Sequence, residues 1–126
     1  MSEAVRGVVM AHADLAAGLV GAVRAIAGHD GGLAVLSNTG CDRAALAGLL
    51  DDAAGDGPVL VFTDLAGGSC AAVAAAVARG RPAMRVVSGV NLGMLLDFVF
   101  HREEPLDAAA ARAAASGRDA VREVGR

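Results

Sequence analysis

Two side chains that can act together in group transfer each follow an apolar run of the sequence. His12 follows the run at 6–11, and Asp64 follows the run at 58–63. Histidine changes charge near neutral pH and is a good nucleophile, although a histidine at the end of a strand is more often only a satisfied polar residue. If the two runs are neighbouring strands, the Asp64 carboxylate accepts a hydrogen bond from one imidazole nitrogen. The other nitrogen is then left as a nucleophile.

The residues after Asp64 have the composition of an anion site. Gly67 and Gly68 allow the backbone to turn sharply, and Ser69 opens a segment of helical character. The first turn of a helix presents free N–H groups and the positive end of the helix dipole, so a phosphoryl group is the expected ligand. A lone Gly-Gly-Ser is only weak evidence for a phosphate site, because many turns into helices have this composition. Ser69 also suits a simple helix cap.

The remaining histidines and the two cysteines suggest no further chemistry. His29 and His101 lie near expected helix ends, and the histidines lack the short spacing of metal ligands, so neither a metal nor a cofactor is predicted. Cys41 and Cys70 form no Cys-x-x-Cys pair, which favours a reduced setting. Cys70 fits a small buried residue better than a redox group, because it has no nearby second cysteine.

The chain alternates apolar runs with longer segments of helical periodicity. Because the runs are apolar throughout, they predict parallel strands covered by helices on both faces. We therefore expect an α/β fold: a single doubly wound domain over residues 1–126 with a four-stranded sheet. Ligands of such sheets bind beyond the carboxyl ends of the strands. The expected strands are residues 6–11, 33–37, 58–63 and 84–89.

The end of the chain allows two interpretations. Residues 105–117 are rich in alanine and predict a helix that ends at Gly117. Residues 118–124, RDAVREV, fit either a further helical turn or a short polar edge strand.

Charge and hydropathy exclude several classes of protein. The net charge is −3 and the arginines are interleaved with acids, which argues against a nucleic-acid surface. No uncharged apolar stretch approaches the roughly 18 residues that a membrane span needs. A cytoplasmic protein is therefore expected.

Three spaced segments together resemble the mannose-type IIA component of the bacterial phosphoenolpyruvate-dependent sugar phosphotransferase system. They are VVMAHADLAAGL at 8–19, VFTDLAGGSC at 61–70 and VVSGVNLGMLLDF at 86–98, in the family's order and spacing. With the tail, the resemblance covers nearly the whole chain.

The resemblance implies a role for each residue of the site. His12 would carry the phosphoryl group, and Asp64 would orient the imidazole. Ser69, with Gly68 beside it, would help to bind the phosphate at the start of the helix. Asn91 would be structural or part of a partner surface.

The resemblance also implies partners. A protein of this family takes a phosphoryl group from the carrier HPr and passes it to a IIB component, and so serves the membrane components IIC and IID indirectly. It needs no metal or cofactor and touches no nucleic acid. The family forms homodimers, often by exchanging a C-terminal strand, which here would be residues 118–124.

The sequence departs from the family at four positions. Ala13 stands where glycine often follows the active histidine, and Ala66 stands where an aromatic commonly precedes the glycine pair. Cys70 and Gly93 stand where proline is usual. None of these changes removes a group from the expected chemistry, but the missing aromatic changes the surface that docks a partner.

Two other functions remain open at this point. The first is a regulatory module whose phosphorylation state is read by a partner without any transport, because its chemistry at His12 would be identical. The second is the related IIA-like domain of dihydroxyacetone kinase phosphotransferases, against which the GVNLGM segment at 89–94 argues. A two-component receiver needs a lysine, and the sequence contains none.

Overall fold

The sheet of the protein is parallel throughout, as predicted. The computed structural model describes residues 4–125. The strands lie in the order β2-β1-β3-β4, so β1 and β3 are neighbours at the centre of the sheet. The chain therefore has the four-stranded, doubly wound α/β fold that the sequence predicts. The strands are β1 (Arg6–Ala11), β2 (Ala34–Ser37), β3 (Val59–Thr63) and β4 (Met84–Ser88).

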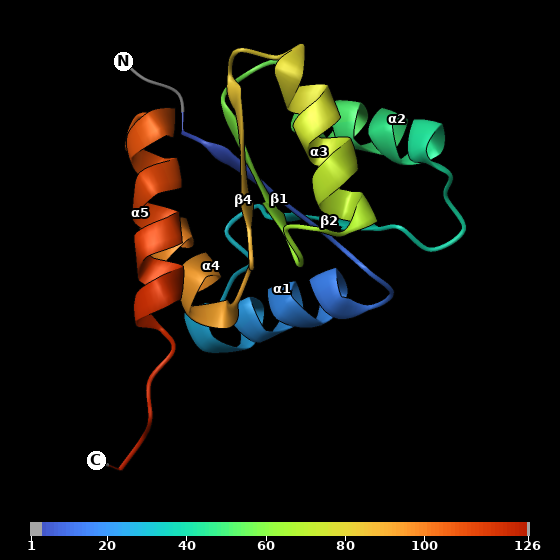
Figure 1. Cartoon of the computed structure of the whole chain (residues 1–126). Helices are drawn as coiled ribbons and strands as arrows, with labels where there is room; N and C mark the ends of the chain where they lie inside the picture. The colour runs from blue at the N-terminus through green and yellow to red at the C-terminus, as the bar shows by residue number, and fades with distance from the viewer. Residues whose placement is uncertain (1–3, 126) are drawn as a thin grey trace.

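Five helices cover the two faces of this sheet (Figure 1). Helices α1, α4 and α5 pack on one face, and α2 and α3 pack on the other. Within the described residues, no helix is long and apolar enough to cross a membrane. The helices are α1 (Leu15–Ala27), α2 (Arg43–Ala54), α3 (Ser69–Arg79), α4 (Leu92–Val99) and α5 (Leu106–Asp119).

The central strands are apolar on both sides because both of their faces are covered. In β1, Val9 packs with α1 and α4, whereas Val8 and Met10 pack with α2 and α3. The aromatic ring of Phe62 on β3 meets Phe98 of α4 edge to face, with ring centroids 5.1 Å apart. These buried contacts fix the positions at which β1 and β3 end.

Side-chain caps explain where two of the helices begin. The Asp42 carboxylate accepts a hydrogen bond from the Ala45 N–H at 2.8 Å and caps α2. Asn91 caps α4 in the same way through the Met94 N–H at 2.9 Å. Its side-chain amide also donates to the Gly117 carbonyl of α5 at 3.0 Å. Asn91 therefore has a structural role, joining α4 to α5.

The C-terminal segment differs from both sequence interpretations. Helix α5 does not end at Gly117 but continues to Asp119, and Gly117 lies where α5 packs against α4: a Cβ there would lie 2.3 Å from Met94 Cε, so Met94 would have to move. Residues 121–125 form neither a helix nor a strand, and they extend away from the domain (Figure 1). Val121 and Val124 are exposed in this segment.

Candidate active site

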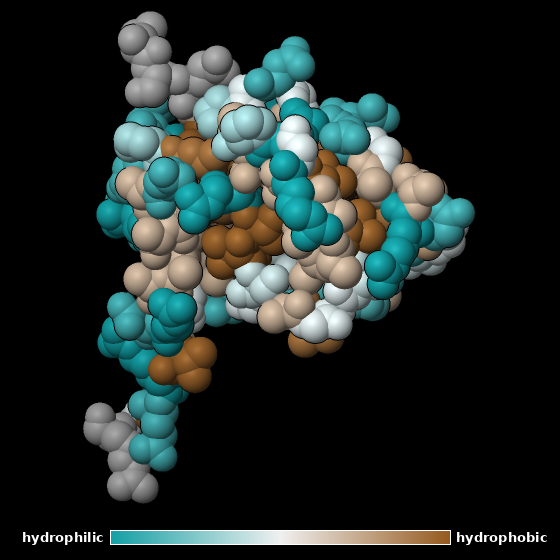
Figure 2. Space-filling model, turned by 45° about the horizontal axis from the view of Figure 1, so that its top comes forward, coloured by the Kyte–Doolittle hydropathy of each residue, from teal (hydrophilic) through white to brown (hydrophobic). Residues whose placement is uncertain are grey.

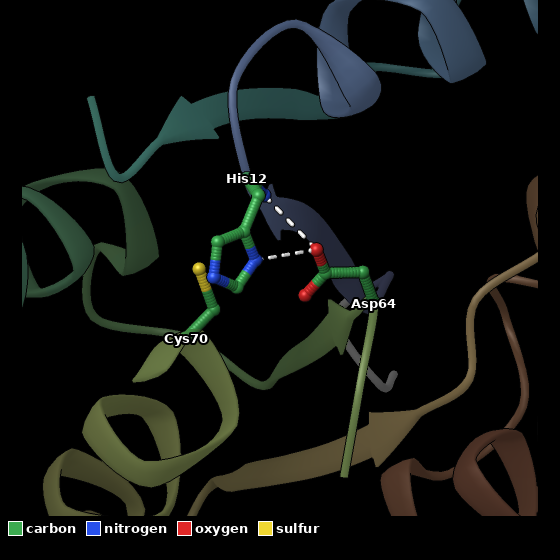
Figure 3. A group of neighbouring side chains, drawn as sticks. All are labelled: His12, Asp64 and Cys70. Atoms are coloured by element: carbon green, nitrogen blue, oxygen red, sulfur yellow. Dashed lines mark hydrogen bonds and ion pairs between the residues drawn. The ribbon is translucent and has the colours of Figure 1, made fainter. Parts of the chain in front are cut away.

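The neighbouring strands β1 and β3 bring His12 and Asp64 together. Met10 pairs with Thr63 across the two strands, so His12 and Asp64 leave the sheet side by side at its carboxyl edge. The imidazole Nδ1 of His12 lies 2.7 Å from Asp64 Oδ2 (Figure 3). The contact inferred from the sequence is therefore present in the structure.

The Asp64 carboxylate is held by three donors and stays ionised. Oδ2 accepts from the His12 backbone N–H at 3.0 Å as well as from the ring, and Oδ1 accepts from the Leu65 N–H at 3.0 Å. Burial alone would raise the pKa of Asp64, but the hydrogen bonds from the His12 backbone and ring outweigh it and lower the pKa. Because a carboxylate only accepts, Nδ1 carries the proton, and Nε2 of the neutral ring has the lone pair.

The second nitrogen of His12 faces the start of α3. Ser69 is the first residue of this helix, and its Oγ lies 3.5 Å from Nε2. Gly68 is the helix cap, and a Cβ there would lie 3.3 Å from His12 Cε1, so the glycine leaves room beside the ring. The structure thus places both predicted phosphate-binding residues next to Nε2. The N–H groups of the first turn of α3 can hold the oxygens of an anion there.

The backbone after His12 has an unusual conformation. Ala13 has a φ of 50°, in the left-handed region that favours glycine. Two hydrogen bonds from the end of β2 hold it there: Ser37 Oγ donates to the Ala13 carbonyl at 2.8 Å, and the Ala13 N–H donates to Asn38 Oδ1 at 3.3 Å. The local geometry therefore suits the glycine that often follows the family's histidine, and β2 supports the site by holding this turn.

Cys70 is a member of the site that the sequence analysis missed. It follows Ser69 in the first turn of α3, is fully buried, and has a ligand atom within 4.8 Å of ligand atoms of both His12 and Asp64. Burial raises the pKa of its thiol, and the Asp64 charge raises it further. No short spacing signals this contact, because 58 residues separate His12 from Cys70. Only the strand order and the helix after β3 reveal it.

The other histidines are not part of this site. His29 lies in the turn after α1, where its Nδ1 accepts a hydrogen bond from the Gly31 N–H at 3.1 Å. His101 follows α4, and its Nδ1 lies 2.7 Å from the Asp97 carbonyl. Both lie near helix ends, as expected.

The fold and the site define a class of protein. It is a doubly wound α/β protein in which a partly exposed histidine, hydrogen-bonded to a mostly buried carboxylate, faces a helix N-terminus. A family model described as the fructose IIA component of the phosphotransferase system matches residues 6–115. The chain therefore belongs to this IIA family and is a phosphotransferase-system component.

Solved structures share the fold of this chain. The mannose/sorbose-specific IIA subunit from Enterococcus faecalis is 30% identical, covers 98% of this chain and 97% of its own, and has a TM-score of 0.88. The component EIIA from Streptococcus agalactiae is 24% identical, with coverages of 94% and 96% and a TM-score of 0.88. A sigma-54 interaction domain protein from Enterococcus faecalis shares the fold at 13% identity, with coverages of 100% and 99% and a TM-score of 0.77. No curated protein matches the chain.

Proposed function

We propose that this protein is a phosphocarrier in which His12 accepts a phosphoryl group from phosphorylated HPr and passes it to a IIB component during sugar uptake. One observation carries the proposal: Asp64 holds Nδ1 at 2.7 Å while Nε2 faces Ser69 and the start of α3. Family membership supports the same role.

Each group at the site has a task in the transfer. The Nε2 lone pair attacks phosphorus, the N–P bond of the donor phosphohistidine breaks, and a new N–P bond forms on His12. As this bond forms, positive charge develops on the imidazole and Asp64 stabilises it. Ser69 Oγ and the first N–H groups of α3 bind the phosphoryl oxygens. Because one N–P bond replaces another, the step runs in both directions, and positioning and charge stabilisation suffice without a cofactor.

The exposure of the histidine suits transfer between proteins. The His12 side chain is 43% exposed, whereas Asp64 is only 9% exposed. A donor protein can therefore reach Nε2 while the orienting carboxylate stays shielded from water. We propose that HPr and IIB approach this face in turn, in the cytoplasm, and that the protein serves the membrane components IIC and IID only through IIB.

The test follows the mass of the intact chain after incubation with purified phospho-HPr from the source organism, freed of enzyme I. We expect one acid-labile phosphoryl group on the wild type and on His101→Ala, and none on His12→Ala. Adding IIB should then remove the group, which separates a relay from a regulatory module. Failure of the folded wild type to gain mass from a competent donor would overturn the proposal, and so would labelling of His12→Ala.

We also propose that the protein is a homodimer in which the C-terminal segment of one copy adds to β4 of the other. β4 is an edge strand, and Figure 2 shows an apolar area over it, between α3 and α5. Val86 and Val87 of β4 are only half-buried, and Val121 is 81% and Val124 92% exposed in the tail. Strand addition would cover both sets of valines. Deleting residues 121–126 should give a monomer by light scattering, and a dimer of unchanged mass would contradict the proposal.

A further inference from the structure

Three side chains of different elements form a set of metal-ligand types beside the nucleophile. His12 comes from the end of β1, Asp64 from the end of β3 and Cys70 from the first turn of α3 (Figure 3). One ligand atom from each, an imidazole nitrogen, a carboxylate oxygen and the thiol sulfur, lies within 4.8 Å of the other two. In Figure 3 the sulfur lies beside the imidazole on the side away from Asp64.

The chemistry of this set selects a particular class of ion. Sulfur and imidazole favour borderline and soft transition metals, and they disfavour Mg²⁺ and Ca²⁺, which require oxygen ligands. Catalytic-type zinc sites have three protein ligands and one open position. Ligand atoms around tetrahedral Zn²⁺ lie about 3.3–3.8 Å apart, given bond lengths of about 2.0–2.3 Å. The three ligand atoms lie within 4.8 Å of one another, so side-chain rotations that turn one ring nitrogen, the carboxylate and the sulfur toward a common point would surround one ion.

We propose that His12, Asp64 and Cys70 bind one Zn²⁺ ion through one atom each, with water in the fourth position. The exposed edge of His12 gives the ion a path from solvent, and the buried Cys70 supplies the ligand that favours zinc. Binding replaces the thiol proton of Cys70, which is released to water, so the sulfur binds as thiolate.

The bound ion prevents phosphorylation of His12. This consequence rests on the proposed phosphocarrier function, whereas zinc binding itself does not. A neutral imidazole has a lone pair on only one of its nitrogens. Whichever nitrogen binds Zn²⁺, none remains to attack phosphorus. Zinc and the phosphoryl group therefore exclude each other, and zinc inhibits the carrier reversibly.

Binding is measured first, without any phosphoryl donor. Co²⁺ is titrated into the reduced protein as a spectroscopic probe for Zn²⁺, and zinc affinity is determined by competition. We expect one ion per chain, a thiolate-to-cobalt charge-transfer band, and a loss of affinity of at least about tenfold in Cys70→Ser and in Asp64→Asn. Cys41→Ser is the matched control, because Cys41 is the other free cysteine and lies outside the cluster.

Several results would overturn the site. They are no charge-transfer band in the wild type, an affinity that Cys70→Ser leaves unchanged in a folded protein, or a loss of binding in Cys41→Ser. Cys70→Ala is a second variant, in which no oxygen replaces the sulfur. Its affinity for zinc should fall at least as far as that of Cys70→Ser. Circular dichroism establishes that each variant is folded.

Inhibition is measured second, with purified phospho-HPr as the donor. Zinc should prevent the mass increase of the wild type and of Cys41→Ser, and a chelator should restore it. For each variant, the extent of phosphorylation with zinc is divided by the extent without zinc. This ratio should be close to one for Cys70→Ser. Equal inhibition of Cys70→Ser would contradict the proposed exclusion. Absence of labelling in zinc-free wild type would instead contradict the phosphocarrier function and leave the metal site standing.

Discussion

Among the described residues, two histidine–aspartate pairs have similar exposure but different hydrogen-bond partners. The side chains of His12 and His101 are 43% and 38% exposed. In the first pair Nδ1 contacts the Asp64 carboxylate at 2.7 Å, whereas in the second it contacts the Asp97 backbone carbonyl at 2.7 Å and the carboxylate only at 3.5 Å. Exposure therefore does not separate the two histidines.

The second nitrogen of each ring makes the difference. Nε2 of His101 lies 3.0 Å from Arg112 Nη2, and an arginine only donates, so the lone pair of His101 is already used. Arg112 also binds the Asp97 carboxylate at 3.0 Å. Nε2 of His12 instead faces a hydroxyl and a helix N-terminus, which can bind a phosphoryl group. Under the proposed function, the carboxylate at one nitrogen and the anion site at the other are what distinguish His12 from His101.

Removing the charge of Asp64 should have the largest effect on the rate of phosphorylation. Asp64→Asn loses the stabilisation of the charged imidazole, and its amide cannot accept from all three donors that the carboxylate satisfies. We expect the rate of phosphorylation by phospho-HPr to fall about a hundredfold, measured by rapid quench and intact mass. Asp97→Asn is the matched control and should keep the wild-type rate. A similar loss in both variants would erase the distinction between the pairs.

Removing the Ser69 hydroxyl should have a smaller effect. Ser69→Ala loses one donor to the phosphoryl oxygens, while the N–H groups of the α3 turn remain. We expect a rate about tenfold lower, in line with the loss of one hydrogen bond to a charged group. The same quench experiment measures it. A rate equal to that of the wild type would mean that Ser69 is only the first residue of the helix.

The stability of the protein should depend on pH through Asp64. The folded-state pKa of this group is lowered below its ordinary value of 3.8. Its stabilising contribution is therefore fully present above about pH 5 and is lost as the pH falls below 4 through the folded pKa. The difference in free energy of unfolding between the wild type and Asp64→Asn, from urea titrations, should shrink over this acid range. A difference that stays constant down to pH 3 would contradict the lowered pKa.

Freeing the second nitrogen of His101 should have the smallest effect. Arg112→Ala removes the donor from Nε2 but adds no group that could hold the oxygens of a phosphoryl group. We expect the doubly altered protein His12→Ala/Arg112→Ala to gain no mass from phospho-HPr. Labelling of this protein would show that a free imidazole nitrogen is sufficient, and the anion site would lose its role in the comparison.

The sequence predicts the contact between His12 and Asp64 because two separate signals agree. Apolar runs locate the ends of β1 and β3, and the parallel arrangement places those ends at one edge, where His12 and Asp64 meet. The position of Gly68 and Ser69 follows from the turn into α3.

Contacts between distant segments are not predictable in this way. Cys70 reads as a small core residue, and its closeness to His12 depends on how far α3 packs against the sheet. Gly117 reads as a helix end, but it lies within α5, where Met94 and Asn91 pack against it. A glycine that ends a helix and one that allows two helices to approach give the same sequence signal.

The most direct test of the account is to identify which ring nitrogen of His12 carries the phosphoryl group. The protein is prepared with ¹⁵N-labelled histidine and phosphorylated by phospho-HPr, and its imidazole nitrogens are observed by NMR. Because Asp64 occupies Nδ1, we predict phosphorylation at Nε2 of His12 and unchanged signals for His29 and His101. Phosphorylation at Nδ1 would contradict the account, because the carboxylate would then not direct the chemistry.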